Sequence, residues 1–168
     1  MSDTDSSDMI AEHNREVGLL STQWAYLEWL LEVAIWWFVG LLNAPDDGRT
    51  LTGTISIGGL ARKARDLAPR RLSTKADLDA MAAIASRIEA VIDERNLAVH
   101  GVRSLQPDNT VLAAVARGKY KSKPEALPLI RIQSLNAEVA RIIAVIEPML
   151  SKHNVIEGIT EISKRYAD

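Results

Sequence analysis

The sequence predicts an all-α fold, a helical bundle with long first and third helices and a small β-hairpin between the third helix and the last long one. Two observations lead to this fold class. Apolar residues recur at helical spacing over three long stretches, and 47% of the 168 residues are hydrophobic, which is enough to bury one substantial core. The expected organisation is a disordered lead-in over residues 1–12, a helical domain over 13–153, and a short helix or tail over 154–168.

The first long helix is predicted from about Asn14 to Leu42. Its two sides are both apolar, one formed by Val17, Leu20, Trp24, Leu27, Leu31, Ile35, Phe38 and Leu42, the other by Tyr26, Trp29, Val33, Trp36 and Trp37. Such a helix needs cover on more than one face, and a second copy of the chain is the simplest source, so we expect a homodimer. Glu28 and Glu32 interrupt the apolar surface, which argues against a membrane span.

A connection is expected after this helix. The turn formers of Asn43–Gly48 end it and lead into a loop over Arg49–Ser56. Residues Ile57–Leu67 have the pattern of a short basic helix. The third helix is predicted over Lys75–Val99, and its candidate N-caps are Ser73 and Thr74.

The pattern changes after Gly101. Short apolar runs at Thr110–Ala116 and Leu127–Ile132 are separated by a polar segment, and we predict a small hairpin or a pair of extended segments there. Ser134 is the expected N-cap of the last long helix, which Pro148 is expected to kink or shorten.

Composition and charge exclude several classes of function. The 20 lysine and arginine residues and 22 aspartate and glutamate residues give a net charge of −2, so any surface that attracts nucleic acid must be local. The absence of cysteine rules out disulfides and thiolate metal sites, and it fits a cytoplasmic protein. No metal or cofactor is expected, because His13 and His153 lack the spacing of metal ligands and are expected at the surface.

The end of the third helix carries the residues best suited to chemistry. Arg95 falls inside the arc that the apolar residues of this helix define, where a guanidinium is costly unless it is paired or opens onto a polar cleft. Asn96 and His100 share the adjoining edge, so three polar side chains gather at the last turn. A permanent cation beside an imidazole can bind a phosphate and move a proton at it. The alternative is structural: His100 favours the helix C-terminus, and Arg95 pairs with Glu28, Glu32 or Glu94.

The stretch Arg95-Asn96-Leu97-Ala98-Val99-His100, at the end of a long helix and directly before Gly101, resembles the signature of the HEPN (higher eukaryotes and prokaryotes nucleotide-binding) superfamily. With the aromatic first helix, the resemblance covers about half of the chain, whereas residues 101–133 match no family. It implies a HEPN-like bundle that dimerises so that two copies of the motif face each other.

The resemblance also implies an activity, that of a metal-independent endoribonuclease of the toxin or defence type. His100 would be the general acid and base, Arg95 would hold the scissile phosphate, and Asn96 would position one or the other. The expected products are a 2′,3′-cyclic phosphate and a 5′-hydroxyl. The expected partners are RNA, a second copy of the chain, and a protein partner such as an antitoxin.

Two other interpretations stay open, a non-catalytic HEPN-like module that binds a nucleotide or a protein, and a structural dimer with a buried ion pair at Arg95. Weaker candidates for contact with an RNA backbone are Arg62, Lys63, Arg65, Arg70 and Arg71, although a solvated helix face is the commoner meaning of such a pattern. Similar alternatives, nucleic-acid contact or hairpin tip, apply to Lys119, Lys121 and Lys123 around Tyr120.

Overall fold

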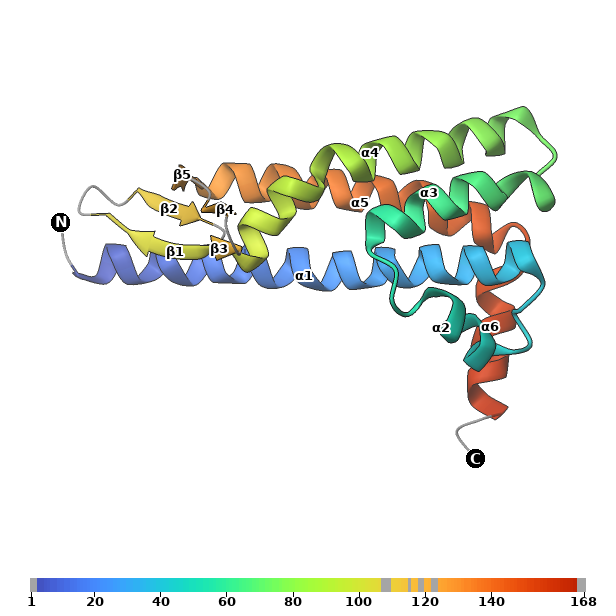
Figure 1. Cartoon of the computed structure of the whole chain (residues 1–168). Helices are drawn as coiled ribbons and strands as arrows, with labels where there is room; N and C mark the ends of the chain where they lie inside the picture. The colour runs from blue at the N-terminus through green and yellow to red at the C-terminus, as the bar shows by residue number, and fades with distance from the viewer. Residues whose placement is uncertain (1–2, 107–109, 115, 118–119, 122–123, 166–168) are drawn as a thin grey trace. The chain divides into compact units, whose positions relative to one another are not determined.

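The computed structural model describes residues 3–106, 110–114, 116–117, 120–121 and 124–165 (Figure 1). Most of these residues are helical, which confirms the predicted all-α class. The chain divides into two compact units, unit 1 with Met1–Trp24 and Val91–Ala140, and unit 2 with Ala25–Ala90 and Arg141–Asp168. The predicted domain boundaries at residues 13 and 153 do not follow this division, and they stay predictions. Within the described ranges, no helix has the length and apolar character that crossing a bilayer requires.

Helix α1, Asp3–Val39, begins well before the predicted start at Asn14. Residues 3–12, which were expected as a disordered lead-in, are therefore helical. The ring of His13 contributes to holding this segment, because it is only 3% exposed and its Nε2 lies 2.7 Å from the carbonyl oxygen of Leu127. The predicted surface location of His13 is wrong, since a distant backbone carbonyl satisfies the ring inside unit 1.

Helix α1 ends at a glycine rather than at the predicted Leu42. Gly40 has a φ of 80°, in the left-handed region that a Cβ disfavours. The N–H groups of Gly40 and Leu41 donate to the carbonyl oxygens of Trp37 and Trp36, at 3.1 and 2.7 Å. This double closure is the Schellman motif, which satisfies the last carbonyl groups of a helix.

A short helix, α2 (Pro45–Thr52), occupies most of the segment that was predicted as turn and loop. Residues 43–48 contain two signals of a helix start beside their turn formers. Pro45 fits the first turn, where its missing N–H is not needed, and Asp46 and Asp47 lie at the positive end of the helix dipole. The loop prediction for Arg49–Ser56 is correspondingly wrong up to Thr52.

Helix α2 lies in close contact with the indole of Trp36 on α1. A Cβ added at the buried Gly48 would lie 2.7 Å from the ring, so only a glycine allows this approach. The indole Nε1–H donates to Thr52 Oγ1 at 3.2 Å, and both groups are buried. Sequence periodicity cannot reveal such a contact, because it joins two different helices.

Helix α3, Ile57–Leu67, matches its prediction, and a 3₁₀ turn, η1 (Ala68–Arg70), follows it. Helix α4 spans Lys75–His100, close to the predicted third helix. Thr74 is its N-cap rather than Ser73, since Thr74 Oγ1 accepts from the Asp77 N–H at 3.1 Å. The same hydroxyl donates to the Asp77 carboxylate and, together with Lys152, holds the pKa of this carboxyl below its usual value.

The strands all belong to unit 1. An antiparallel three-stranded sheet has the order β1-β2-β5, formed by β1 (Val102–Leu105), β2 (Val111–Ala114) and β5 (Glu125–Ala126), and a small second pair joins β3 (Ala116–Arg117) to β4 (Tyr120–Lys121). Within the first predicted run, Thr110–Ala116, the described residues of β2 are extended as predicted, but their main partner is β1, with Val102 opposite Ala114. The second predicted run, Leu127–Ile132, is not a strand, because helix formation begins inside it.

Helix α5, Leu129–Ser151, starts before the predicted cap at Ser134, whose hydroxyl instead donates to Ile130 O within the helix at 2.8 Å. Pro128, directly before α5, suits a helix start. Pro148 lies inside the helix, shortly before its end. Helix α6, Val155–Arg165, follows a turn and corresponds to the short-helix alternative for the C-terminal residues.

Each unit has its own core. In unit 1 it includes Val17, Leu20, Trp24, Leu97, Val111, Leu127, Ile132 and Val139, and in unit 2 Leu27, Leu31, Ile35, Leu60, Met81, Ile84, Ile88, Ile142 and Ile146. Val33 and Trp36, on the side of α1 that was expected to need a second chain, are buried within one chain. The homodimer therefore stays a prediction that rests on the family resemblance rather than on an uncovered helix face.

Candidate active site at the end of helix α4

The three predicted site residues lie at the C-terminal end of α4, in unit 1. This end of the helix is anchored by Leu97 and Ala98, both buried in the unit core. Arg95 and Asn96 are half-buried and His100 is exposed. The side chains of the motif thus extend from the edge of the core to the protein surface.

The guanidinium of Arg95 connects the other two side chains. Its Nη1 donates to Asn96 Oδ1 at 3.3 Å and lies 3.0 Å from His100 Nε2. The structure therefore brings together the three residues that the helical spacing groups. Their chemical roles stay a prediction.

The contact between Arg95 and His100 is a hydrogen bond only with one tautomer of the neutral imidazole. A guanidinium has only N–H donors, so His100 Nε2 must be the acceptor, and the ring proton must lie on Nδ1. The nitrogen that faces the cation consequently carries a lone pair. A lone pair of this kind is what a general base needs, next to a group that can bind an anion.

Trp24 on α1 explains how a guanidinium is accommodated at the edge of the core. The Arg95 Cζ lies 5.0 Å from the centroid of the Trp24 ring, which is 2% exposed. A cation over an indole is stabilised by the negative face of the ring. The sequence placed Trp24 on the apolar face of the first helix but gave no signal for this pairing, since the pairing depends on how α1 and α4 align.

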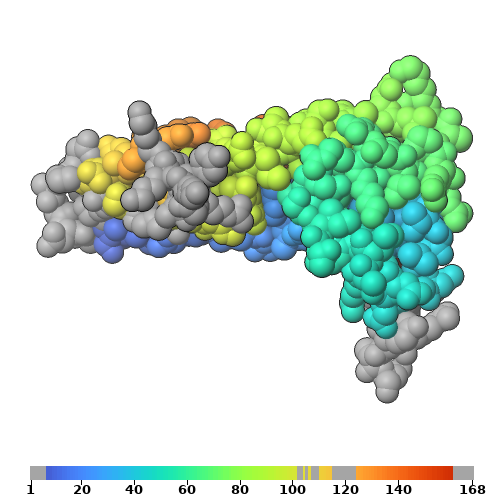
Figure 2. Space-filling view, in the orientation of Figure 1, coloured from blue at the N-terminus to red at the C-terminus, as the bar shows by residue number. Residues whose placement is uncertain are grey.

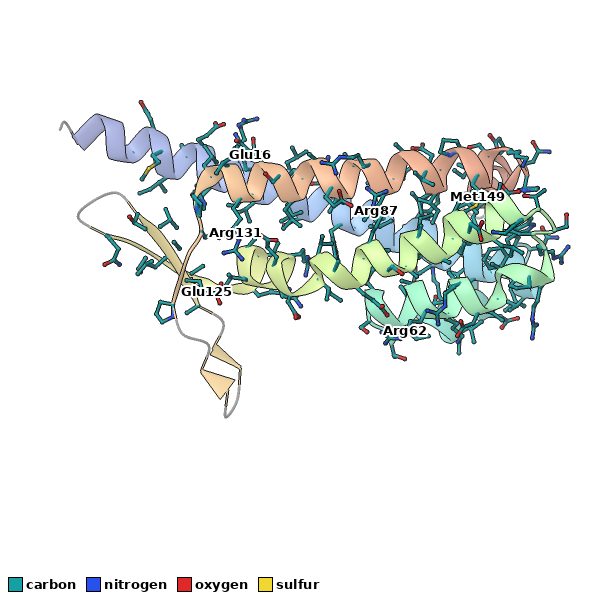
Figure 3. All side chains as sticks on the ribbon, turned by 90° about the horizontal axis from the view of Figure 1, so that it is seen from above. Glu16, Arg62, Arg87, Glu125, Arg131 and Met149 are labelled. Carbon is teal, nitrogen blue, oxygen red and sulfur yellow. The ribbon has the colours of Figure 1, made fainter. Side chains whose placement is uncertain are left out.

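A neighbouring ion pair ties the end of α4 to α5 and β5. Arg131 Nε bonds Glu94, Arg131 Nη1 donates to Ala126 O at 3.2 Å, and Glu125 lies 3.6 Å away (Figure 3). Glu94, one of the acids considered as a partner for Arg95, therefore pairs with Arg131 instead. This clamp fixes the helix turn that presents the motif.

Gly101 closes α4 directly after His100. Its N–H donates to Leu97 O at 3.0 Å, and a Cβ at this position would collide with that same oxygen. A glycine here lets the chain leave the helix at once and enter β1. Because only glycine fits at position 101, Gly101 determines that α4 ends directly after His100.

The basic residues of α3 and η1 lie in unit 2, and α3 forms part of the surface in Figure 2. Arg62 pairs with Glu89 at 3.0 Å, and Arg65 pairs with Asp66 at 2.9 Å. Lys63 is half-buried, whereas Arg70 and Arg71 are exposed. A role of these residues in nucleic-acid binding stays a prediction, and the side chains of Lys119, Tyr120, Lys121 and Lys123 lie outside the described residues.

His153 is half-buried rather than at the surface as predicted. Its ring lies 4.9 Å from that of Trp37, centroid to centroid, and its Nε2 is a buried atom. In the part of the chain that the structure describes, no three potential ligands from His, Cys, Asp or Glu gather as a metal site requires.

No family model matches the chain, and no curated protein or solved structure is significantly similar to it.

Proposed function

We propose that this protein is a HEPN-like, metal-independent endoribonuclease whose site comprises Arg95, Asn96 and His100. The observation that supports this most directly is the 3.0 Å contact between Arg95 Nη1 and His100 Nε2 at an exposed helix end. It offers a permanent cation and a proton acceptor to the same phosphodiester.

The reaction begins when the phosphate replaces His100 as the acceptor for Arg95. The guanidinium donates to the non-bridging oxygens and stabilises the charge that develops on them, while Asn96 Oδ1 orients it. The released Nε2 of His100 takes the proton of the ribose 2′-hydroxyl. The 2′-oxygen attacks phosphorus and the bond to the 5′-oxygen breaks, which leaves a 2′,3′-cyclic phosphate.

The departing 5′-oxygen needs a proton from an acid on the opposite side of the phosphorus. The chain has three histidines, and the other two do not suit this role. His13 is buried against Leu127, and His153 packs against Trp37 with its Nε2 buried. A second copy of the chain supplies a second His100, and a homodimer with a composite site therefore completes the proposal. A cytoplasmic location and a restraining partner of the antitoxin type belong to the same proposal.

The test is cleavage of single-stranded RNA in the presence of EDTA. Wild-type protein should give 2′,3′-cyclic phosphate and 5′-hydroxyl ends, identified by mass spectrometry. His100→Ala should abolish cleavage, and Arg95→Lys should reduce it by about 100-fold or more, because lysine cannot form the planar two-bond contact. Arg49→Ala, at an arginine whose side chain is 74% exposed, is the matched control and should cleave as wild type does.

Three measurements separate the parts of the proposal. Light scattering gives the mass of the active species. If a species of monomer mass has full activity, the hypothesis of a composite site is wrong. If RNA stays intact with both wild type and His100→Ala, the endoribonuclease hypothesis is wrong. If an oligoribonucleotide then raises the melting temperature of wild type but not of Arg95→Gln, the non-catalytic binding module takes its place.

A further inference from the structure

A small cavity lies at the C-terminal end of α1 in unit 2, in a different unit from the candidate active site. It has a volume of about 180 Å³ and is lined by Trp37, Gly40, Leu42, Asn43 and Arg71. We propose that this cavity is a binding site for a small aromatic carboxylate, a single ring with one acidic group. The proposal does not depend on the ribonuclease activity.

Arg71 supplies the charge that recognises the carboxylate. Its guanidinium is exposed, and none of the described residues bonds or pairs with it, in contrast to Arg62 and Arg65 on α3. The Arg71 Nη2 lies 3.5 Å from the point where a Cβ of Gly40 would stand. The guanidinium therefore lies beside the backbone turn that ends α1. An arginine in this situation can offer two parallel N–H groups to a carboxylate.

Trp37 supplies an aromatic surface for the ring of the ligand. Its indole is held by two neighbours, Phe38 at 5.2 Å and His153 at 4.9 Å between ring centroids. A ligand ring gains by packing against such a fixed aromatic side chain in a stacked or tilted arrangement. Asn43 adds an amide donor and acceptor that can read a polar substituent on the ring.

Size and charge select this ligand class over others. Sites for drug-sized ligands have volumes of about 300–1,000 Å³, so a cavity of about 180 Å³ suits one ring better than a nucleotide. The negative end of the α1 dipole opposes an anion here, but the full positive charge of Arg71 in the cavity lining outweighs this partial charge. The net local charge therefore favours a monoanion.

The test uses benzoate as the probe and NMR of the nitrogen-labelled full chain as the measurement. Benzoate should shift the indole N–H of Trp37 and the side-chain amide of Asn43, and the shifts should saturate. Benzyl alcohol, which lacks the charge, and acetate, which lacks the ring, should each bind at least about tenfold more weakly, since each loses one of the two interactions. AMP is included to represent a nucleotide.

Matched variants locate the charge. Arg71→Gln should weaken benzoate binding by about tenfold or more, whereas Arg70→Gln, at the neighbouring exposed arginine, should leave it nearly unchanged. The proposal is overturned if benzoate does not saturate by about 10 mM, if both variants bind it equally, or if AMP binds more tightly than benzoate at the same resonances.

Discussion

Helix α1 presents a different inner surface in each of the two units. In unit 1 it buries His13 and Glu16 among its apolar residues, whereas in unit 2 it buries an almost unbroken apolar surface that includes Leu30, Val33 and Trp36. The buried polar and charged side chains of the described residues are distributed in the same way: His13, Glu16 and Asn136 belong to unit 1, and Thr52 belongs to unit 2.

The polar contacts of unit 1 join α1 to α5. Asn136 Nδ2 donates to Glu16 Oε2 at 2.7 Å and to Glu16 O at 3.1 Å, and Arg15 Nη2 donates to Glu16 Oε1 at 2.8 Å. A buried carboxylate accepts only one alignment of its donors, so this network fixes the register of the two helices more strictly than apolar packing does. Unit 2 relies instead on close steric fit, as at Gly48 under Trp36. Unit 1 therefore buries a hydrogen-bonded network between two helices, whereas unit 2 buries a close steric contact beside the hydrogen bond from Trp36 to Thr52.

The largest expected effect comes from breaking the network of unit 1. Asn136→Ala removes a donor from the buried Glu16 carboxylate and should lower the free energy of unfolding by about 3 kcal/mol. Urea denaturation followed by circular dichroism measures this change. Gln133→Ala, at a half-buried polar position on the same helix, is the control and should cost less than about 1 kcal/mol. Equal losses in both variants would show that the network does not stabilise unit 1.

The second prediction tests the steric fit of unit 2. Gly48→Ala places a methyl group against the Trp36 ring and should destabilise the protein by about 2 kcal/mol. Gly18→Ala makes the same change on an exposed turn of α1, where no atom beyond the local helix backbone lies within 4 Å of the new methyl. That variant should stabilise the protein by about 1 kcal/mol through helix propensity. Thermal denaturation should show a lower melting temperature for Gly48→Ala and a higher one for Gly18→Ala. An unchanged melting temperature for Gly48→Ala would contradict the close steric fit at Trp36.

The smallest expected effect concerns a polar contact in unit 2. Burial, and then the hydrogen bond that Tyr26 donates to Glu147 at 2.9 Å, raise the pKa of Tyr26 above its usual value. The folded state therefore favours the neutral phenol. This contribution to stability is fully present below about pH 10 and is lost as the pH rises through the raised pKa, because the unfolded chain releases its proton first.

Ultraviolet absorbance of tyrosinate, compared between wild type and Tyr26→Phe, gives the titration of this phenol. Glu147→Gln should move that titration toward lower pH. The prediction fails if Tyr26 titrates at the same pH as a tyrosine in an unstructured peptide and Glu147→Gln does not change this pH. The contact would then not stabilise unit 2.

The candidate site was predictable in part because it lies within one helix. Arg95, Asn96 and His100 belong to six consecutive residues at the end of one helix, and the long Arg95 side chain reaches both of the others. Trp24 was not predictable as a member of the site, since its contact with Arg95 joins residues from two helices. The pairing of β1 with β2 was missed for a similar reason, because short apolar runs can choose among several partners.

The sequence by itself determined the elements whose signals are local. The extents of α3 and α4 follow from periodicity and from caps within a few residues. The three motif residues are placed together because all of them belong to the last turns of α4. Only the tertiary structure decided two other features. These are the contact between His13 and Leu127 in the N-terminal part of α1, and the packing of the Arg95 guanidinium over the Trp24 ring. Such features depend on which surfaces become buried together, and that free energy is shared between segments far apart in the chain.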